Sequence, residues 1–486
     1  MAESERSPIE QAFDQLRQEL GIRSGFPDDV LHEAERVARE KDPAASPAHA
    51  DRTDVPFVTI DPPGSRDLDQ ALHLERAGDG FRVRYAIADV GFWVERGGAI
   101  EREAWQRGVT FYAPDHRESL YPTSLSEGAA SLLPDQVTPA VLFTMELDAR
   151  AEPRSTAVER ARVRSRAQLT YEQALDHIEG GGKRFAGEEW AESLVLLREF
   201  GELRRQREAE RGGTSLPAQD QHVQKQAAAR LGYQLEYEGP NPAEEWNAQL
   251  SLLTGHVAAQ RMLEARVGLL RTMPPADPED VAKFRRAAAA LGFPWADEAS
   301  YAEFIRSLDL KNPHLPALLW QARRLNHGAD YVAFDGDPPE NTQHSALAWE
   351  YAHATAPLRR LADRYVLDLL ATLGAGNRPS PEEVATLCAL PKVMNEAETR
   401  AAKLERRAVD VAEAWTLRGC EGRVYPATVL GFRNGHDVEV QLENPPVRAV
   451  AKREGTEPRL EPGEPVQVRV AGVDATKGEV RFEVAG

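Results

Sequence analysis

The sequence predicts an α+β protein built from several domains. Its 486 residues are more than one hydrophobic core usually holds. Strand-like alternation begins near Val55, helical periodicity dominates from about residue 168 to 418, and strand-like alternation then returns. We predict a small helical N-terminal module, a central domain of mixed sheet and helices, and a C-terminal OB-type β-barrel, at residues 1–50, 51–418 and 419–486.

Two or three short helices are predicted in the N-terminal module. Ser7 and Glu10 match a capping box at the start of the first helix, and the second helix begins near Pro27. A helix-turn-helix or winged-helix module is compatible with this pattern, but helical spacing alone does not indicate nucleic-acid binding. Residues 41–54 are predicted to be a linker. The apolar stripes of the two helices are Ile9, Phe13, Leu16 and Leu20, and Val30, Leu31, Ala34 and Val37.

Alternating apolar residues predict the strands of the other two domains. In the central domain, residues 72–87 form a hairpin around a turn at 78–80, and residues 140–149 form a further strand. Short strands separated by turns near the C-terminus predict a small closed barrel. They lie at residues 423–433, 436–443, 465–475 and 479–486.

Composition limits the classes of function. The two cysteines, Cys388 and Cys420, form no CxxC pair, so we expect neither a disulfide framework nor a zinc finger. The polar, acidic start of the chain does not resemble a signal or transit peptide. No apolar run reaches the length that spans a bilayer. We therefore expect a cytoplasmic protein with no membrane partner.

Arginine is concentrated in short runs although the net charge is −19. Phosphate binding needs positive charge, so the net charge by itself argues against a nucleic-acid partner. We interpret most of the arginine runs as solvated helix faces, and a basic channel inside an acidic protein is the alternative. The runs lie at residues 160–166, 204–211, 283–286, 358–364 and 404–407.

The segment DPPGSRDLDQALHLE (61–75) gathers three aspartates before an apolar strand. Its Pro-Pro-Gly turn excludes a helix. In extended backbone Asp67 and Asp69 point to the same face, and Asp61 folds back over the turn to join them. Carboxylates at this density suit Mg²⁺, which prefers oxygen ligands and retains water. The alternative is an acidic turn exposed to solvent.

The segment YAHATAPLRRLADRYVLDLL (351–370) predicts a helix that begins after Thr355. Its apolar stripe leaves Arg359 and Arg360 projecting from the first turn. Main-chain amides, the helix dipole and guanidinium groups at one helix end all favour an anion. We therefore predict a phosphate clamp here, with surface arginines on an ordinary helix as the alternative.

Several ordered motifs resemble the RNB domain, the catalytic domain of ribonucleases II and R. The aspartate segment is followed by I-A-D-V, R-G-x-x-x-Y-x-P and L-S-x-x-x-x-S-L motifs, and then by YAHATAPLRRLADR and LERRAVDVAEAW. The C-terminal barrel resembles the S1-type RNA-binding domain that follows the RNB domain in this family. The resemblance covers about residues 51–486. The five later motifs occupy residues 87–90, 107–114, 125–132, 351–364 and 404–415.

The resemblance implies an exoribonuclease. The family hydrolyses single-stranded RNA processively from the 3′ end and releases nucleoside 5′-monophosphates with Mg²⁺; Mn²⁺ is the alternative metal. Asp61, Asp67 and Asp69 would bind the metal and position the attacking water, with Asp69 in the catalytic set. The family's fourth aspartate is Gln70 here. A neutral amide is a weaker ligand than a carboxylate, so one metal site is expected to be weaker or filled by water.

The resemblance also implies a set of RNA contacts. Arg359 would hold the scissile phosphate and stabilise its developing charge, with Arg360 beside it. Tyr112 would stack on a terminal base. Glu405, also in the catalytic set, would accept hydrogen bonds from the terminal ribose hydroxyls, which helps to select RNA over DNA. The expected partner is single-stranded RNA, bound by a monomer that forms no stable complex with DNA.

The chain departs from the family pattern in two further places. The predicted helix at 246–263 lacks the family's glutamates and asparagine, and we expect its His256 to be packed or at the surface rather than catalytic. About 50 mostly helical residues stand where the family has two cold-shock barrels. The entrance for RNA and the handling of structured RNA are therefore expected to differ.

Two other functions compete with the exoribonuclease. A non-catalytic RNA-binding regulator would explain Gln70, but such a protein has no need for metal ligands together with a phosphate clamp. A metal-dependent phosphohydrolase acting on DNA or small phosphoesters is the third hypothesis, and the S1-type barrel favours RNA over both of these substrates. A panel of RNA, DNA and nucleoside phosphates as substrates separates the phosphohydrolase from the exoribonuclease.

Overall fold

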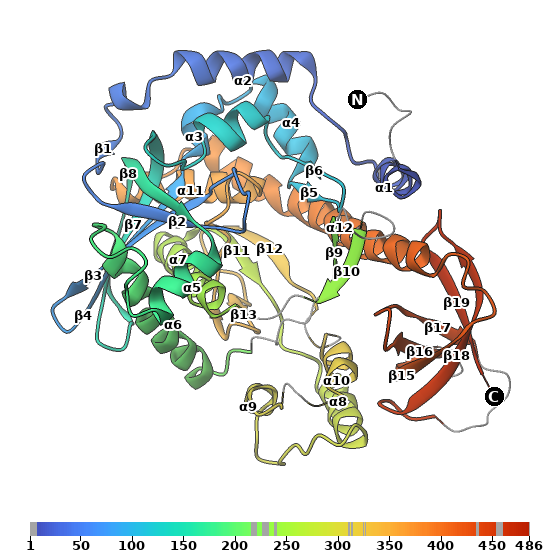
Figure 1. Cartoon of the computed structure of the whole chain (residues 1–486). Helices are drawn as coiled ribbons and strands as arrows, with labels where there is room; N and C mark the ends of the chain where they lie inside the picture. The colour runs from blue at the N-terminus through green and yellow to red at the C-terminus, as the bar shows by residue number, and fades with distance from the viewer. Residues whose placement is uncertain are drawn as a thin grey trace.

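The chain folds into a helical N-terminal module, a central domain of mixed sheet and helices, and a C-terminal barrel (Figure 1). This confirms the predicted α+β multidomain class. Parts of the predicted N-terminal module (1–6) and of the barrel (434–436, 453–459 and 486) lie outside the described residues. The computed structural model describes residues 7–214, 221–225, 233–237, 241–309, 312, 314–323, 325, 327–433, 437–452 and 460–485.

The N-terminal module contains two α-helices, as predicted. Helix α1 (Pro8–Glu19) begins with the Ser7–Glu10 capping box. Helix α2 (Asp28–Glu40) follows, and a single 3₁₀ turn (Pro43–Ala45) leads out of the module.

One position of the predicted stripe on α2 is wrong. Leu31 is 37% exposed, whereas Val30, Ala34 and Val37 are buried. Leu31 lies about 100° around the helix from Val30, outside the narrow face that contacts the core. After α2, the predicted linker ends in strand β1 (Ala50–Asp51), which pairs in parallel with β8.

The central sheet has the strand order β1-β8-β2-β3-β4-β7, and β8 also pairs with β7. The predicted hairpin is formed by β3 and β4, paired from Gln70↔Ile87 to Ala77↔Gly80. The arginine run at 160–166 lies in β8, so its interpretation as a helix face is wrong. Ala161 and Val163 are buried between partly exposed arginines, which is the period of a strand. The remaining strands of the sheet are β2 (Phe57–Ile60), β3 (Gln70–Ala77), β4 (Gly80–Ala88), β7 (Val137–Leu147) and β8 (Pro153–Leu169).

A short hairpin, β5–β6, contacts the N-terminal module through Asp115 and Glu118. Its strands are β5 (Phe111–Tyr112) and β6 (Arg117–Glu118), with Tyr112 opposite Arg117. The hairpin follows helices α3 (Val90–Trp93) and α4 (Ala99–Arg107) and precedes a single π-helical turn (Leu125–Ala129).

The region from about residue 168 to 418 is mainly helical, as predicted, but it also contains strand pairs that the periodicity did not reveal. These are β9 (Gln221–Lys225) with β10 (Tyr233–Tyr237), β11 (Val267–Thr272) with β12 (Asp330–Asp335), and β13 (Gln343–His344) with β14 (Trp349–Glu350). The helices are α5 (Tyr171–Glu179), α6 (Ala191–Glu210), α7 (Pro242–Ala265), α8 (Pro278–Ala290), α9 (Tyr301–Arg306), α10 (Leu315–Ala322), α11 (Leu361–Gly374) and α12 (Pro381–Leu417).

The C-terminal barrel is closed, with the strand order β15-β16-β17-β19-β18, as expected for an OB-type domain. Helix α12 runs from the central domain to this barrel (Figure 1). The barrel strands are β15 (Val424–Arg433), β16 (Asp437–Leu442), β17 (Arg448–Lys452), β18 (Pro465–Asp474) and β19 (Glu479–Val484).

The N-terminal helices share one hydrophobic core with the central domain. Ile9, Phe13 and Leu16 of α1 belong to the same buried cluster as the central sheet, while the barrel has a cluster of its own. The module is therefore packed as part of the central domain rather than attached by a free linker. In the part of the chain that the structure describes, no helix combines the length and the apolar character needed to cross a membrane.

Candidate active site

Asp69 is the buried centre of the site. It immediately precedes β3 and is 2% exposed. One of its carboxylate oxygens accepts a hydrogen bond from the Leu358 main-chain N–H (2.7 Å), and the other accepts one from Nε of Arg359 (3.0 Å). Burial raises the pKa of Asp69 to about 7, because water no longer solvates the ionised form. Two distant segments thus meet at this carboxylate.

Arg359 does not project from a helix as predicted. Helix α11 begins only at Leu361, because the preceding main chain pairs with the end of α4 instead of continuing as a helix. The Thr110 N–H donates to the Arg359 carbonyl and the Leu361 N–H donates to the Gly108 carbonyl, both at 2.9 Å. The Arg359 side chain is 44% exposed while its Nε stays on Asp69. Its guanidinium can therefore contact a ligand without leaving the carboxylate.

Arg360 has a different environment from its neighbour. Its guanidinium donates to both oxygens of Asp363, at 2.8–3.2 Å, and the Asp363 side chain is completely buried. The main-chain N–H of Ala356 also donates to Asp363 (2.7 Å). Arg360 therefore holds the turn before α11 in place, and its predicted contact with RNA stays a prediction.

Asp61 and Asp67 lie on either side of the turn that the Pro-Pro-Gly sequence forms. Oδ2 of Asp61 is buried and accepts no hydrogen bond from a described residue, and burial raises the pKa of Asp61 to about 6. Asp67 is engaged: its Oδ1 accepts a hydrogen bond from Arg117 (2.7 Å), whose other amino group donates to Glu127 (2.6 Å). The charge of Asp67 raises the pKa of both Asp61 and Asp69, so the three aspartates form one cluster.

Two of the predicted ligands fit a divalent cation best. The orphaned oxygen of Asp61 and the buried carboxylate of Asp69 are groups whose ionised forms a cation would stabilise. Asp67 pairs with Arg117 as Asp69 pairs with Arg359, but the side chain of Asp67 is more exposed (14% against 3%), so its ionised form needs a cation less. The amide nitrogen of Gln70 donates to the Thr355 carbonyl. Among the described residues no group of three or more His, Cys, Asp or Glu surrounds a single point. A bound metal would therefore rest on Asp61 and Asp69 first.

Tyr112 stands at the edge of this cluster. Its side chain is 50% exposed, which leaves the ring free for stacking. Partial burial and the nearby Asp67 and Asp69 raise the pKa of its hydroxyl, while Arg359 opposes the rise.

Glu405 lies elsewhere: it is exposed on α12, and no hydrogen bond or ion pair joins it to the described residues of the cluster. Its predicted role in holding the terminal ribose stays a prediction.

The sequence did not point to Arg117 or Glu127, although both reach the cluster. Neither belongs to a periodic or charge-rich segment, and the only signal was their place near the R-G-x-x-x-Y-x-P and L-S-x-x-x-x-S-L motifs. His256 is packed, as expected: its ring stacks on Trp349 (4.0 Å between centroids), and Nδ1 donates to the Glu350 carbonyl (2.9 Å).

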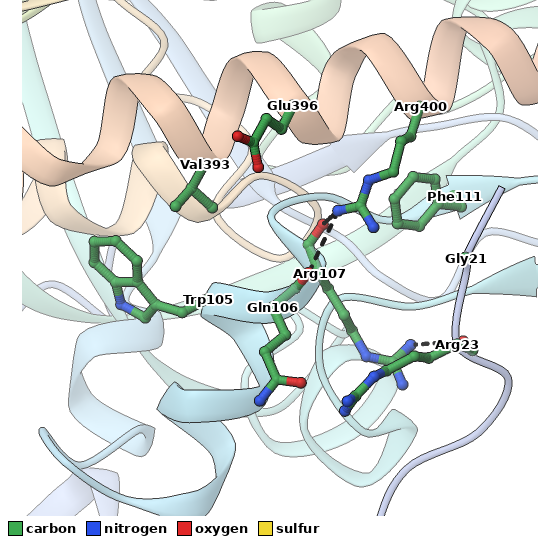
Figure 2. Close-up of a pocket in the computed structure, with 9 residues that line it drawn as sticks. All are labelled: Gly21, Arg23, Trp105, Gln106, Arg107, Phe111, Val393, Glu396 and Arg400. Carbon is green, nitrogen blue, oxygen red and sulfur yellow. Dashed lines mark hydrogen bonds between the residues drawn. The ribbon is translucent and has the colours of Figure 1, made fainter.

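A pocket of about 310 Å³ lies where the N-terminal module meets the central domain (Figure 2). Arg107 donates from this position to the Arg23 and Ser119 carbonyls, and Arg400 of α12 donates to the Gln106 and Arg107 carbonyls. These contacts tie the module to the β5–β6 hairpin and to α12. The lining residues are Gly21, Arg23, Trp105, Gln106, Arg107, Phe111, Val393, Glu396 and Arg400.

A buried acidic cluster with an arginine and an exposed tyrosine, on a mixed sheet followed by an OB-type barrel, defines the ribonuclease II and R class of fold. Residues 49–375 match the RNB domain, and residues 423–485 match the RNase II-type exonuclease C-terminal S1 domain. The chain belongs to the RNB-domain family, as its motifs indicated.

Named relatives support the family at low sequence identity. Ribonuclease R of Aquifex aeolicus (strain VF5) is 26% identical over 508 residues, which cover 97% of this chain and 70% of the relative. Ribonuclease R of Escherichia coli (strain K12) is 28% identical over 349 residues, which cover 70% of this chain but only 42% of that enzyme. Both relatives are named as ribonucleases R.

Solved structures show the same fold. The apo form of Mycoplasma genitalium RNase R has a TM-score of 0.86 at 18% identity and covers 98% of this chain and 78% of its own. Yeast Ssd1, described as a pseudonuclease, has a TM-score of 0.69 at 16% identity and covers 91% of this chain and 55% of its own. The fold therefore occurs both with and without nuclease activity, and the site must decide between them.

Proposed function

We propose that this protein is a divalent-metal-dependent 3′→5′ exoribonuclease that hydrolyses single-stranded RNA processively to nucleoside 5′-monophosphates. The observation that supports it most is the pairing of the buried Asp69 with the half-exposed Arg359. A non-catalytic fold gains little from an ionisable carboxylate whose pKa burial raises to about 7. The monomeric state, the cytoplasmic location and the lack of a stable DNA complex stay predictions.

The protein's own groups would bind and orient the RNA end. Arg359 would donate to a non-bridging oxygen of the scissile phosphate and stabilise its growing charge. The Tyr112 ring would stack on a terminal base without regard to its identity. Glu405 would accept hydrogen bonds from the ribose hydroxyls that DNA partly lacks.

Hydrolysis then breaks a single bond. Water attacks phosphorus, the bond between phosphorus and O3′ of the preceding nucleotide breaks, and that O3′ leaves as the new terminal hydroxyl. When bound, Mg²⁺ or Mn²⁺ supplies charge stabilisation and lowers the pKa of a coordinated water. Asp61 and Asp69 would hold the metal, and Asp69 would keep Arg359 oriented towards the phosphate.

A time course on 5′-labelled single-stranded RNA tests the proposal. We expect shortening to a small limit product with Mg²⁺, no shortening with EDTA, and no shortening of the same sequence in DNA. Asp69→Asn is the matched inactive variant. Release of a labelled mononucleotide without labelled intermediates of decreasing length, or RNA that stays intact with either metal, would contradict the proposal.

A non-catalytic RNA-binding regulator is the second candidate. It is favoured by the engagement of Asp67 with Arg117 and of Gln70 with Thr355, which leaves fewer groups for a metal. In that case RNA would shift on a native gel but remain uncut under every metal condition. Cleavage of DNA or small phosphoesters at a rate similar to that of RNA would instead favour the general phosphohydrolase.

A further inference from the structure

Arg117 bridges two carboxylates at the edge of the aspartate cluster. One amino group donates to Asp67 (2.7 Å) and the other to Glu127 (2.6 Å). The three side chains are between 14% and 29% exposed, so solvent screens these ion pairs only in part. One guanidinium thus divides its charge between two carboxylates and compensates Asp67 in part, without a metal ion.

The charges at the site explain why a second fixed cation is useful. Asp61, Asp67 and Asp69 would together repel the RNA backbone, and Arg359 compensates only one of them directly. Arg117, which is shared with Glu127, compensates a second in part. A guanidinium in this position also opposes a divalent cation that approaches Asp67, because like charges disfavour one another at short range.

Arg117 is held at this place by its hairpin, and α1 holds the turn of that hairpin. Arg17 is fully buried and donates to both oxygens of Asp115, at 2.7 and 2.8 Å. Asp115 lies in the loop between Tyr112 and Arg117. A bidentate guanidinium–carboxylate pair fixes orientation as well as distance.

The far strand of the hairpin is fixed by the segment that follows α1. Glu118, directly after Arg117, accepts hydrogen bonds from the Ser24 hydroxyl (2.8 Å) and the Gly25 N–H (3.2 Å). Arg107 binds the Gly25 and Arg23 carbonyls from the other side, beside the pocket drawn in Figure 2. The N-terminal module therefore binds both the turn of the β5–β6 hairpin and its strand β6, which carries Arg117.

We propose that Arg117 is a built-in cation of the carboxylate cluster, which competes with a divalent metal for Asp67 and is positioned there by the N-terminal module. The inference rests on the proposed function, since it concerns the same carboxylates. By this inference, the N-terminal module positions Arg117 beside Asp67, which is a role separate from contact with RNA.

Binding of Mn²⁺ in the absence of RNA tests the competition. Electron paramagnetic resonance of free Mn²⁺ gives the affinity and the number of bound ions at constant ionic strength. We expect Arg117→Gln to bind Mn²⁺ on the order of tenfold more tightly than the wild type, because Asp67 is released. Arg154→Gln is the matched control: it removes the same charge from a bidentate ion pair with Asp79, at the opposite end of β3. Unchanged or weaker binding by Arg117→Gln overturns the proposal.

A second pair of variants tests the role of the module. Asp115→Asn removes the charge on the hairpin that Arg17 binds, without opening a cavity, while Arg17 keeps its other carboxylate partner, Asp14. Asp79→Asn is the control in the exposed Arg154 pair. We expect Asp115→Asn to tighten Mn²⁺ binding in the same direction, by about threefold, because the hairpin holds Arg117 less firmly. If Arg117→Gln tightens binding and Asp115→Asn does not, the competition stands and the positioning by the module is refuted.

The metal titration separates this inference from the proposed function. Tighter Mn²⁺ binding by Arg117→Gln supports the inference even if the wild type leaves RNA uncut, in which case the exoribonuclease proposal alone fails. If the wild type cleaves RNA but Arg117→Gln binds Mn²⁺ as the wild type does, the exoribonuclease proposal stands and the proposed role of Arg117 fails.

Discussion

Replacing Asp69 by asparagine should stabilise the metal-free protein at alkaline pH while abolishing RNA cleavage. Asparagine has nearly the same shape as aspartate but cannot ionise. The side chain is 2% exposed, so the charge of Asp69 is carried in a site from which water is excluded. The gain in stability and the loss of cleavage have one cause: the negative charge of Asp69 is needed to bind a metal, but it destabilises the fold while no metal is bound.

The magnitude follows from the pKa. Burial raises the pKa of Asp69 from the ordinary 3.8 to about 7, which corresponds to roughly 4 kcal/mol at about 1.4 kcal/mol per pKa unit. Because the folded pKa is the higher one, this cost is absent below pH 3.8, grows as the pH rises, and is complete above pH 7. Asparagine loses one hydrogen bond with Leu358 or Arg359, at about 1–3 kcal/mol. The variant should therefore gain about 1–3 kcal/mol at pH 8.

Urea denaturation in EDTA, followed by tryptophan fluorescence, measures this difference at pH 8 and pH 5. The gain should shrink at pH 5, where the wild-type carboxylate is largely protonated in the fold. Adding Mn²⁺ should stabilise the wild type more than the variant. A variant that is less stable than the wild type at pH 8 would show that the ion pair with Arg359 outweighs the burial of charge, and would refute the reasoning.

Three further predictions concern the rest of the site. Tyr112→Ala should change the length of the limit product on a sequencing gel more than the initial rate, because its exposed ring would contact a base rather than the scissile phosphate; an unchanged ladder would contradict stacking. Mn²⁺ affinity, measured by calorimetry, should rise with pH and level off above about pH 7. A cation must displace the protons of Asp61 and Asp69, whose pKa values are raised to about 6 and about 7. A flat profile from pH 5 to 8 would argue that other groups bind Mn²⁺. Arg360→Met should lower the free energy of unfolding by about 3–5 kcal/mol, because it leaves the buried Asp363 charge unpaired; loss of cleavage with unchanged stability would instead assign Arg360 to RNA binding.

Local rules were sufficient where a segment decides its own structure. The capping box of α1, the β3–β4 hairpin and the barrel strands β15, β16, β18 and β19 follow from nearest-neighbour chemistry, and the structure confirms them. The remaining strand of the described barrel, β17, was not predicted. The same rules failed before α11. The Thr355 segment has the composition of a helix start, yet its main chain bonds to residues 108–110, which are distant in sequence. A tertiary pairing outcompeted the local preference there.

The arginine run in β8 shows a related limit. Alternation of arginine with small apolar residues fits a strand, but the charges suggested a solvated helix, and only the neighbouring strands β2 and β7 decide between the two. The pairs β9–β10, β11–β12 and β13–β14 were also missed. Their strands are two to six residues long, which is too short for a clear alternation. Only β11 and β12 pair across a long helical stretch, whereas the strands of the other two pairs lie close together in the sequence.

The sequence by itself determined the family, because ordered motifs such as the aspartate segment and LERRAVDVAEAW depend only on residue types and spacing. It also indicated that Asp61, Asp67 and Asp69 belong together, since the turn between them is local. Only the tertiary structure decided what each carboxylate contacts: Asp69 meets Arg359, Asp67 meets Arg117, and Asp61 keeps one oxygen that has no hydrogen-bond partner among the described residues. These partners come from other elements of the fold, and long-range contacts of this kind carry no periodic signal in one sequence.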